Sequence, residues 1–427
     1  MNRNPNILIM KHYLYTFLAI AMIVSCGKKG ASENASSPDI QITDTKETNL
    51  TVPEQPIALS DEENDMLSRF NDFGFDVMRK NEENYLFSPL SLASLLGMLA
   101  QGGAGLTREE ICRVLRFEDA SSYMDINALC KKMRILTSPS DKTAFQMANA
   151  AVCAEWIDFK ESYTQTVTEY YDALLTSMDF SQAEQVCAYI NEWADEKTHG
   201  LIPEVLRPEQ IKSSIAVFLN ALYFKSAWKS PFPKDLTRDE TFTNQLGNTT
   251  TVPMMHQKNE YLFAALEDFQ LLEMDYDGTF AMDVLLPSNG KTTSDLIAVL
   301  SDEKLTNWRS SMTSRPVDCK LPAFSTDIQT YVLREDLQDL GMKAAFSDAD
   351  FSNLSSADLF ITTIFQKGNL SIDEAGTEAA AVSVALMESS VPWDQSNAVE
   401  FHANHPFVYI IYEKTTAAVL FIGVYNG

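Results

Sequence analysis

The sequence predicts an α+β fold, with helices packed on large, mostly antiparallel β-sheets in a single domain spanning residues 61–427. Apolar residues recur at helical spacing through much of the first half of this region. In the second half, runs of β-branched and aromatic residues typical of buried strands take over. No second linker, low-complexity break or internal repeat interrupts the region, so one large domain is expected despite its length.

The N-terminus has the pattern of a targeting signal. A basic start at Met10–His12 leads into an apolar run over residues 13–24, which is too short for a comfortable membrane span. Ser25 followed by Cys26 resembles the cleavage site of bacterial lipoproteins, in which the cysteine becomes lipidated. We therefore expect residues 1–25 to be a lipoprotein signal peptide and Cys26 to be the lipid anchor; an ordinary export signal with an incidental cysteine is the alternative.

Residues 26–60 form a polar segment that is rich in Ser, Thr, Asn, Pro, Lys and Glu and almost free of aromatic residues. Such a composition cannot bury enough apolar surface to fold alone. We expect a flexible tether between a lipid anchor and the folded domain. With the expected lipid on Cys26, this implies a membrane-anchored protein of a bacterial cell envelope. We expect the outer membrane, and leave open whether the protein faces the periplasm or the outside.

Helices are expected in the first half of the domain. Thr107, with Glu110 three residues later, has the spacing of a helix cap. The Gly102–Gly105 stretch follows a helical pattern and lacks a lysine, so it predicts a turn and not a phosphate-binding loop. The expected helices cover residues 65–80, 89–100, 107 onward, 163–175 and 183–199.

Strands are expected in the second half, where apolar runs are short and rich in Val, Ile, Phe and Tyr. Their spacing and length fit buried strands of large sheets. The expected strands cover residues 216–224, 280–286, 317–324, 407–412 and 418–424.

The segment Glu374–Val384 has the most unusual pattern. Its alanines favour helix, whereas Val382–Val384 favours a strand. Read with a period of two, one face of the segment holds only small residues. Such a strand could enter between two existing strands without overfilling the core beneath them, and Gly376 offers a bend just before it. The small face consists of Thr377, Ala379, Ala381, Ser383 and Ala385.

Charge and side-chain chemistry exclude several functions. The net charge is −26 with no basic stripe, which argues against binding nucleic acid. The histidines lack zinc-site spacing, no nucleophile elbow is present, and no isolated carboxylate pair suggests a glycosidase. We expect no enzyme, no cofactor and no metal. The five remaining cysteines lie in apolar contexts, and their redox state is left open: Cys112, Cys130, Cys153, Cys187 and Cys319.

Several segments closely resemble the serpins, a family of serine and cysteine protease inhibitors. The segment from Glu374 resembles the family's reactive-loop hinge, and the other matching segments occur in the family's order across nearly all of the folded part. This resemblance implies the serpin fold with an exposed reactive-centre loop. The matching segments are Tyr85–Leu92, Asn220–Trp228, Val252–Met255, Leu321–Phe324, Leu340–Met342, Leu370–Val384 and His405–Tyr409.

The resemblance also implies roles for individual residues. Trp228 matches the "breach", where loop insertion begins, and Ser88, Ser91 and Asn220 match the polar "shutter" beneath the sheet. The shutter usually includes a histidine where this chain has Gln366, so an altered shutter is expected. The hinge residues would be Glu374, Gly376, Thr377, Ala379, Ala380, Ala381 and Ser383.

The resemblance implies inhibition by a suicide mechanism, in which a target serine or cysteine protease cleaves the loop and is trapped as a covalent complex. The family spacing places the scissile bond at Ser390–Val391, with Met387–Glu388 as the alternative. Small residues there suit elastase-like or subtilisin-like proteases, and the lack of Arg or Lys between Glu374 and Glu400 argues against trypsin-like ones. We expect a monomer. A non-inhibitory surface lipoprotein that binds a partner is the alternative function.

Overall fold

The computed structural model describes residues 58–80, 86–119, 121, 123–136, 143–200, 202–212, 214–326, 329–362, 364–368, 370–377 and 397–427. All of them belong to one compact unit, Leu50–Gly427. Several predicted sites lie outside these residues: Cys26, Ala379, Ala380, Ala381, Ser383 and both candidate scissile bonds, Ser390–Val391 and Met387–Glu388. Within the part of the chain that is described, no helix is both long and apolar enough to cross a membrane.

The helices gather mainly in the first half of the chain. Helix α1 (Asp61–Met78) begins with a capping box, because Ser60 and Glu63 exchange side-chain to backbone hydrogen bonds of 3.2 and 2.8 Å. The helix α2 (Pro89–Gly102) is buried along its whole length. The remaining helices are α3 (Gly105–Val114), α4 (Tyr123–Leu136), α5 (Glu161–Tyr171), α6 (Ala183–Lys197), α7 (Pro208–Ile211), α8 (Thr293–Val299), α9 (Asp302–Ser311) and α10 (Arg334–Asp339).

The first of the two sheets, here called the hinge sheet, has the strand order β10-β13-β14-β4-β12-β11, with β2 paired to β4 and β3 to β2. Most pairs are antiparallel, while β2–β3 and β4–β12 are parallel. Its strands are β2 (Thr143–Ala154), β3 (Leu174–Met178), β4 (Ala216–Ala227), β10 (Phe324–Ser325), β11 (Gln329–Val332), β12 (Ile364–Gly368), β13 (Ser371–Asp373) and β14 (Gly376–Thr377).

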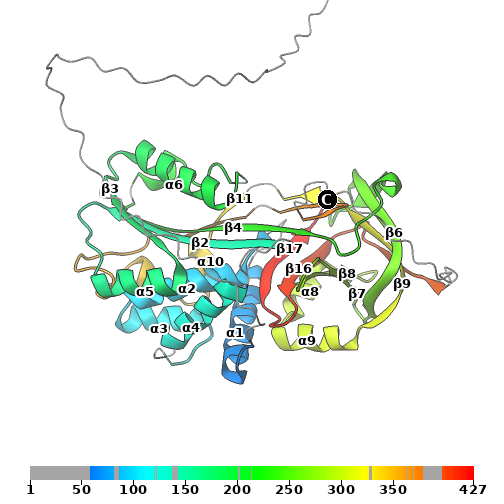
Figure 1. The fold of residues 1–427 in the computed structure, drawn as a ribbon, viewed down its shortest axis with the longest axis horizontal. Helices are drawn as coiled ribbons and strands as arrows, with labels where there is room; N and C mark the ends of the chain where they lie inside the picture. The colour runs from blue at the N-terminus through cyan, green and yellow to red at the C-terminus, as the bar shows by residue number, and fades with distance from the viewer. Residues whose placement is uncertain are drawn as a thin grey trace, which may run out of the picture. The chain divides into compact units, whose positions relative to one another are not determined.

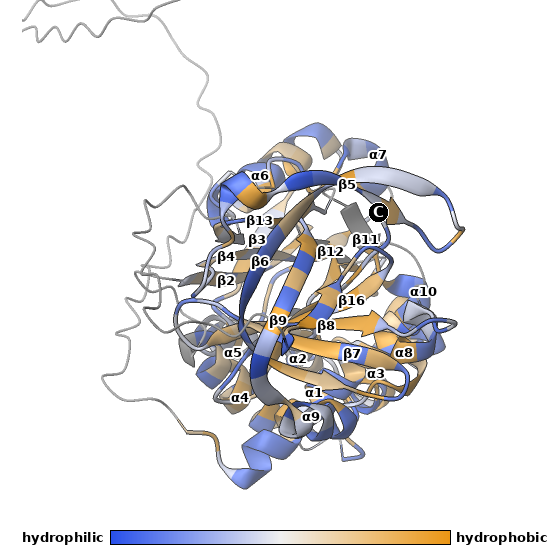
Figure 2. Ribbon diagram, turned by 90° about the vertical axis from the view of Figure 1, so that its right-hand side faces the viewer, coloured by the Kyte–Doolittle hydropathy of each residue, from blue (hydrophilic) through white to orange (hydrophobic). Residues whose placement is uncertain are grey.

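The second sheet, here called the C-terminal sheet, has the order β1-β17-β16-β8-β7-β6-β9-β15, with β5 paired to β6. Strands β8 and β16 are strongly hydrophobic, as Figure 2 shows, and together with β7 they are buried along most of their length. Its strands are β1 (Leu86–Phe87), β5 (Arg238–Thr243), β6 (Thr249–Ala265), β7 (Phe269–Asp275), β8 (Phe280–Pro287), β9 (Thr313–Pro322), β15 (Val399–His402), β16 (Phe407–Glu413) and β17 (Val419–Tyr425).

The hinge sheet is covered by helices on both faces, with α6 above β2 and β4 and α2 beneath them (Figure 1). The period of two along β4 explains why. Val217 and Leu219 pack in the cluster that contains α6, whereas Phe218 and Phe224 pack in the cluster that contains α2. Asn220 belongs by position to the α2 face, which places a polar side chain in an apolar layer.

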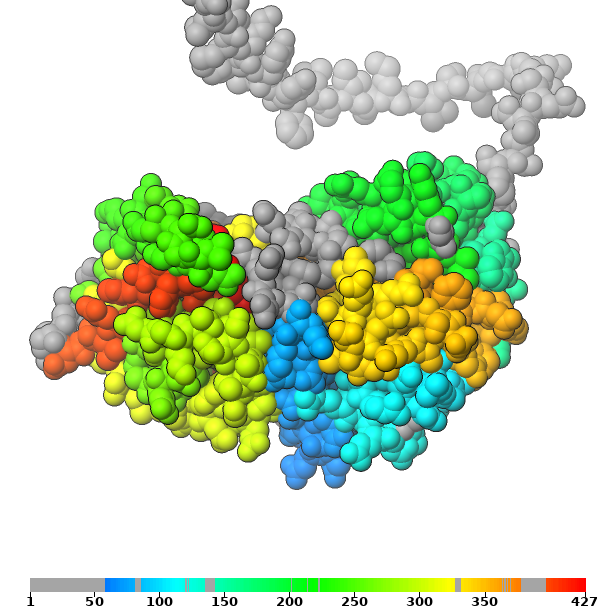
Figure 3. Space-filling view, turned by 180° about the vertical axis from the view of Figure 1, so that it is seen from behind, coloured from blue at the N-terminus to red at the C-terminus, as the bar shows by residue number. Residues whose placement is uncertain are grey.

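Helix α1 is exposed on the face of the molecule that lies behind in Figure 1. Figure 3 shows it there between the yellow-green segment of α8 and α9 and the gold segment that follows β11. Asn71 of α1 donates a hydrogen bond to Asp302 of α9 at 2.7 Å. The same side chain accepts from the backbone N–H of Val419 in β17, at 3.0 Å. One buried amide thus joins three elements that are far apart in sequence.

The predicted α+β class is confirmed. Several predicted element bounds are wrong, and three of them have a clear structural reason. Helix α3 begins at Gly105, so Thr107 lies inside it; its hydroxyl instead accepts from the N–H of Asp350 at 2.8 Å. The helix expected to reach residue 175 ends at Tyr171, because Asp172 turns into the left-handed conformation (φ 51°) and strand β3 follows. The strand expected over 317–324 is divided into β9 and β10.

All five cysteines in the described part of the chain are buried and none forms a disulfide. Burial raises the pKa of the Cys130 thiol to about 12 and that of Cys112 to about 11. A thiol with such a pKa carries almost no thiolate at neutral pH and is a poor nucleophile. These cysteines serve as small apolar side chains of the core.

Candidate functional site

The predicted hinge lies in the middle of the hinge sheet. Strand β14 pairs antiparallel with β4 on one side, where Thr377 faces Ser226, and with β13 on the other, where Thr377 faces Ile372. Farther along β4, strand β12 pairs directly with it, in parallel, from Ile364 to Lys367. One edge of β4 is therefore paired with β12 along one part and with the two hinge residues of β14 along another. At the β14 part, the hinge separates β4 from β13.

A tight turn delivers the hinge to this position. Asp373 accepts hydrogen bonds from the backbone N–H groups of Ala375 and Gly376, at 2.8 and 3.1 Å, through the same carboxylate oxygen. Gly376 has a φ of +146°, and a Cβ there would lie 2.2 Å from the carbonyl oxygen of Ser226. Only glycine meets both the conformation and the close approach, which explains the bend expected at this residue.

Trp228 fixes both sides of that turn. Its backbone N–H donates to the carbonyl of Ala375, and its indole Nε1 donates to the carbonyl of Asp373, both at 2.9 Å. The indole ring also stacks on Tyr276, with ring centroids 4.2 Å apart and planes at 11°. Since Trp228 directly follows strand β4 and bridges to Tyr276, just after β7, the predicted breach residue joins the hinge sheet, the hinge and the C-terminal sheet at one point.

Thr377 is fully buried, and its hydroxyl lies 2.6 Å from that of Tyr276. Burial raises the pKa of Tyr276 well above its usual range, so the phenol remains protonated and able to donate. Glu374, within the turn, accepts a hydrogen bond from the Thr237 hydroxyl at 2.6 Å, and its carbonyl accepts from the backbone N–H of Phe232 at 2.8 Å. The hinge is thus bonded on each side as well as seated in the sheet.

The predicted shutter residues also come together, under the closed part of the sheet. Gln366 accepts from the N–H of Ser88 at 3.0 Å and donates to the Ser88 carbonyl at 3.2 Å. Ser91 hydrogen-bonds Asn220, which in turn donates to Asn149 at 2.9 Å. All are buried, and Gln366 lies directly opposite Asn220 across the β4–β12 pair. Gln366 therefore meets both hydrogen-bonding groups of the Ser88 backbone from the position where a histidine was expected.

Sequence reasoning missed three residues of this site. Asn149 extends the shutter by donating to Ser94 at 3.3 Å, and its place among small apolar residues of β2 was the available signal. Tyr276 was missed because its role depends on a contact across the fold. Asp373 was missed although its contacts are local, and an Asp two and three residues before the bonded N–H groups, typical of a turn, was the available signal. No local pattern marks a tyrosine that will meet a threonine 101 residues later.

The chain re-enters the described structure beyond the loop at β15, which pairs in parallel with β9. His256 lies 2.6 Å from Asp318 and Lys258 lies 2.9 Å from it, on the same sheet face as His402. Burial tends to raise the pKa of Asp318, but hydrogen bonds from Lys258 and His256 outweigh it and lower that pKa. Among the described residues, no group of three His, Cys, Asp or Glu is arranged to hold a metal ion.

Comparison with known proteins identifies the architecture. A family model described as serpin (serine protease inhibitor) matches residues 68–427. The leukocyte elastase inhibitor of Xenopus tropicalis is 32% identical over 376 residues, covering 83% of this chain and 97% of that protein. An uncharacterised serpin-like protein of Thermococcus kodakarensis is 30% identical, covering 95% and 96%.

Solved structures agree with this result. Human thyroxine-binding globulin superimposes with a TM-score of 0.77 at 27% identity, covering 85% of this chain and 98% of that one. Uncleaved ovalbumin gives a TM-score of 0.75 at 29% identity, with 85% and 99% covered. Proteins of this family are generally protease inhibitors and not catalysts, although some members are non-inhibitory. The chain belongs to the serpin family.

Proposed function

We propose that this serpin inhibits serine proteases, and also cysteine proteases of matching specificity, by acting as a suicide substrate. The observation that carries the proposal is the seated hinge. Strand β14 already occupies the opening between β4 and β13, with Thr377 buried in the position that an inserting strand would occupy first. Family membership and the elastase inhibitors among its relatives support the same reading.

The reaction follows from ordinary acyl-transfer chemistry. The hydroxyl or thiol of the protease attacks the carbonyl carbon of Ser390, the bond to Val391 breaks, and the proton of the nucleophile passes to the new amino group of Val391. The C-terminal part of the chain stays bound through the buried strands β16 and β17. The protease is then held as an acyl-enzyme on the freed loop. Insertion of that loop into the hinge sheet carries the protease away and distorts its active site before water can release it. Met387–Glu388 is the alternative bond.

The register of β14 predicts where the inserting residues would go. Gly376 pairs with Ala227 and Thr377 with Ser226, so the same antiparallel register brings Ala379 opposite Phe224 and Ser383 opposite Asn220. Phe224 packs on the ring of Tyr276, which lies beneath Thr377. Small side chains are therefore required on this face, because the aromatic core below leaves no room for large ones.

Insertion to this depth requires β12 to separate from β4, since β12 pairs with the same edge of β4 from Phe218 to Ala221. The shutter bonds of Gln366 and Asn220 lie at that junction, so they set part of the barrier. The gain outweighs this cost. A new central strand forms hydrogen bonds along both edges at about 1 kcal/mol each, which sums to a free energy on the order of 10 kcal/mol or more. That is comparable with the stability of a whole domain.

The targets we propose are elastase-like or subtilisin-like proteases. Small residues at the proposed scissile bond suit shallow specificity pockets, and the absence of Arg and Lys from the loop argues against trypsin-like enzymes. The relatives include proteins named leukocyte elastase inhibitor, which supports this class.

We further propose that the protein works at a bacterial cell envelope. The Ser25–Cys26 pattern supports export and lipidation, and the polar segment over residues 26–60 supports a tether. An anchored inhibitor would protect the envelope against proteases from a host or a competitor. Mass spectrometry of the mature protein would test this, because an N-terminus without a lipid on Cys26 removes the basis for anchoring.

A denaturing gel with mass spectrometry tests the inhibitory function. The purified protein is mixed with an elastase-like protease and separately with a subtilisin-like one. We expect a covalent band at the summed mass of the two proteins less that of the C-terminal peptide, and that peptide, released on denaturation, should begin at Val391. If both proteases cleave the protein and neither forms a covalent band, the proposal is contradicted. That result would favour a non-inhibitory serpin that binds a partner.

A further inference from the structure

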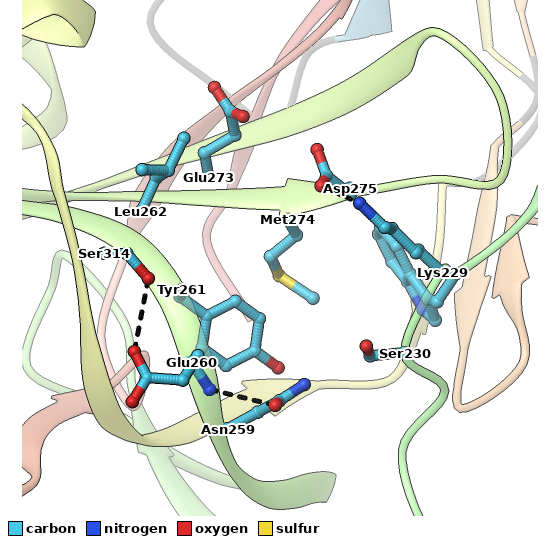
Figure 4. Close-up of a pocket in the computed structure, with 11 residues that line it drawn as sticks. Lys229, Ser230, Asn259, Glu260, Tyr261, Leu262, Glu273, Met274, Asp275 and Ser314 are labelled. Carbon is cyan, nitrogen blue, oxygen red and sulfur yellow. Dashed lines mark hydrogen bonds and ion pairs between the residues drawn. The ribbon is translucent and has the colours of Figure 1, made fainter. Parts of the chain in front are cut away.

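The end of strand β7 borders a small groove beside the breach. Strands β6 and β7 pair only as far as Leu262 and Glu273, so the last two residues of β7, Met274 and Asp275, pair with β8 but not with β6. The space that opens between the two strands has a volume of about 210 Å³, and Figure 4 shows it in close-up. Strand β6 therefore does not position the residues that lead into Tyr276.

The chain at the end of β4 takes the place of β6 there. The backbone N–H of Lys229 donates to the carbonyl of Asp275 at 2.9 Å, and the N–H of Asp277 donates to the carbonyl of the last residue of β4 at 2.8 Å. Between these two bonds, Trp228 and Tyr276 lie opposite each other as an antiparallel bridge. This short ladder joins the two sheets and contains both aromatic residues that support the hinge.

Two lysines hold the carboxylate of Asp275. Lys229 pairs with its Oδ2 at 3.0 Å (Figure 4), and Lys414 pairs with its Oδ1 at 2.6 Å. The lysines come from separate elements, since Lys229 follows β4 and Lys414 lies between β16 and β17. Burial tends to raise the pKa of Asp275, but hydrogen bonds from Lys414 and Lys229 outweigh it and lower that pKa, so the carboxylate is ionised at neutral pH.

Lys414 is itself fixed by further contacts. Its Nζ also pairs with Glu273 at 2.7 Å, and its backbone N–H donates to the carbonyl of Thr279, in the turn after β7, at 2.7 Å. Figure 4 shows Glu273 and Asp275 on the same side of β7, with Met274 on the other. One ammonium group therefore bridges two carboxylates, and it keeps a partner in Glu273 if Asp275 loses its charge.

The contacts of Asp275 reach the hinge through its chain neighbour, Tyr276. The ring of Tyr276 stacks on Trp228, and its hydroxyl lies 2.6 Å from that of Thr377. A shift of Tyr276 would disturb both contacts. The two lysines that hold Asp275 fix the end of β7 relative to β4 and β16, and so fix the place of this tyrosine.

We propose that Asp275 is a positioning residue for the hinge. Its carboxylate, held between the two lysines, fixes Tyr276 and thereby keeps the hinge strand β14 seated in the hinge sheet. The side chain of Lys229 is 66% exposed, so salt screens its pair with Asp275, and seating of the hinge depends on ionic strength. The effect on protease trapping rests on the proposed function, whereas the effect on hinge seating does not.

Amide hydrogen exchange on the full chain, without protease, tests this proposal. Asp275→Asn keeps the size of the side chain and removes its charge. At a low NaCl concentration of about 0.05 M, exchange in the peptide that contains residues 370–377 should be about two- to fivefold faster in this variant than in the parent. At about 1 M NaCl, where the screening length is only about 3 Å, the parent should approach the variant and the difference should fall below about twofold.

Asp268→Asn is the matched control, because Asp268 forms a surface pair with Lys291 at 2.9 Å at the other end of β7. Its exchange at the hinge should equal that of the parent at both salt concentrations. Lys229→Gln, at an exposed side chain, removes one of the two lysines and should speed exchange in the same salt-dependent way as Asp275→Asn, by a smaller factor. It decides alone if Asp275→Asn does not fold.

Three results would overturn the proposal. Exchange at the hinge could be the same in Asp275→Asn and the parent, it could be faster by the same factor at both salt concentrations, or it could rise equally in Asp268→Asn. The second result would mean that Asp275 supports the hinge by packing and not by its charge. Since no measurement involves a protease, failure of inhibition would leave these results intact.

Discussion

The hydroxyl of Tyr276 lies 2.6 Å from that of Thr377, across 101 residues of sequence, and joins the C-terminal sheet to the hinge. Both side chains are buried, so the bond is shielded from water. Tyr276 also stacks on Trp228, which holds the turn before the hinge. One aromatic pair therefore supports the hinge from below and from the side.

Replacing Tyr276 by Phe should loosen the hinge without disturbing the core. The variant keeps the ring that stacks on Trp228 and loses only the hydroxyl, which leaves Thr377 without this partner. We expect a loss of about 1 kcal/mol and faster amide exchange over residues 370–377. Tyr163→Phe, which removes another buried hydroxyl far from the hinge, is the control. Equal exchange at the hinge in both variants would refute the role of this bond.

A large charged residue at Thr377 should block insertion. Thr377 already lies in the sheet, fully buried over aromatic rings, so Thr377→Arg should unseat the hinge, since the alternative is a buried, unpaired charge, and the residues that follow cannot insert. We expect the variant to fold, to be cleaved by the target protease and to form no covalent complex on a denaturing gel. Thr377→Ser keeps the hydroxyl and should still trap the protease. Covalent trapping by Thr377→Arg would mean that insertion does not begin here.

The altered shutter gives a prediction about stability. Gln366→Leu is similar in size but leaves the N–H of Ser88 without its acceptor in a buried site. The free energy of unfolding should fall by about 1–3 kcal/mol. The same substitution at the exposed Gln245 is the control and should change it by less than about 0.5 kcal/mol. Chemical denaturation measures the free energy of unfolding of both variants and of the parent. If Gln366→Leu is as stable as the parent, Gln366 does not stabilise the sheet.

A buried carboxyl group predicts a pH dependence. Burial raises the pKa of Asp283 to about 6, against the opposing attraction of Arg309, whose Nε donates to it at 2.7 Å. Because the folded pKa lies above the unfolded value of about 4, this group favours folding most below pH 4, and that contribution is lost as pH rises through about 6. Asp283→Asn cannot ionise. Its stability relative to the parent should therefore rise by roughly 3 kcal/mol between pH 4 and pH 7.

Urea unfolding at each pH measures that difference. Asp268→Asn, in the surface pair with Lys291, is the control, and its difference from the parent should vary little over this range. A constant difference between Asp283→Asn and the parent would show that Asp283 has an ordinary pKa in the folded protein.

The sequence predicted the fold class because it depends on local periodicity. Of the predicted small face of the hinge, the structure describes only Thr377, and the rest stays a prediction. The bend at Gly376 was likewise readable, and its geometry explains it: a side chain would meet the backbone of Ser226. Contacts between residues far apart in the chain could not be predicted from the sequence. Tyr276 meets Thr377, and Asn149 meets Asn220, only after distant strands have paired.

Element ends were predicted less well for a similar reason. The end of α5 depends on Asp172 adopting a left-handed conformation, and the start of α3 depends on Gly105, with φ +46°. Thr107 had the spacing of a cap, yet its hydroxyl bonds to Asp350, more than 240 residues away. Tertiary contacts overrode local patterns at these positions.

The proposed mechanism requires the cleaved loop to enter the hinge sheet as a new strand. The most direct measurement is the melting temperature before and after a protease cuts the reactive loop. A new central strand should raise the melting temperature by more than about 20 °C, since both of its edges gain hydrogen bonds. The same cleavage in Thr377→Arg should give no such rise. An unchanged melting temperature in the cleaved parent protein would contradict insertion, and with it the proposed mechanism.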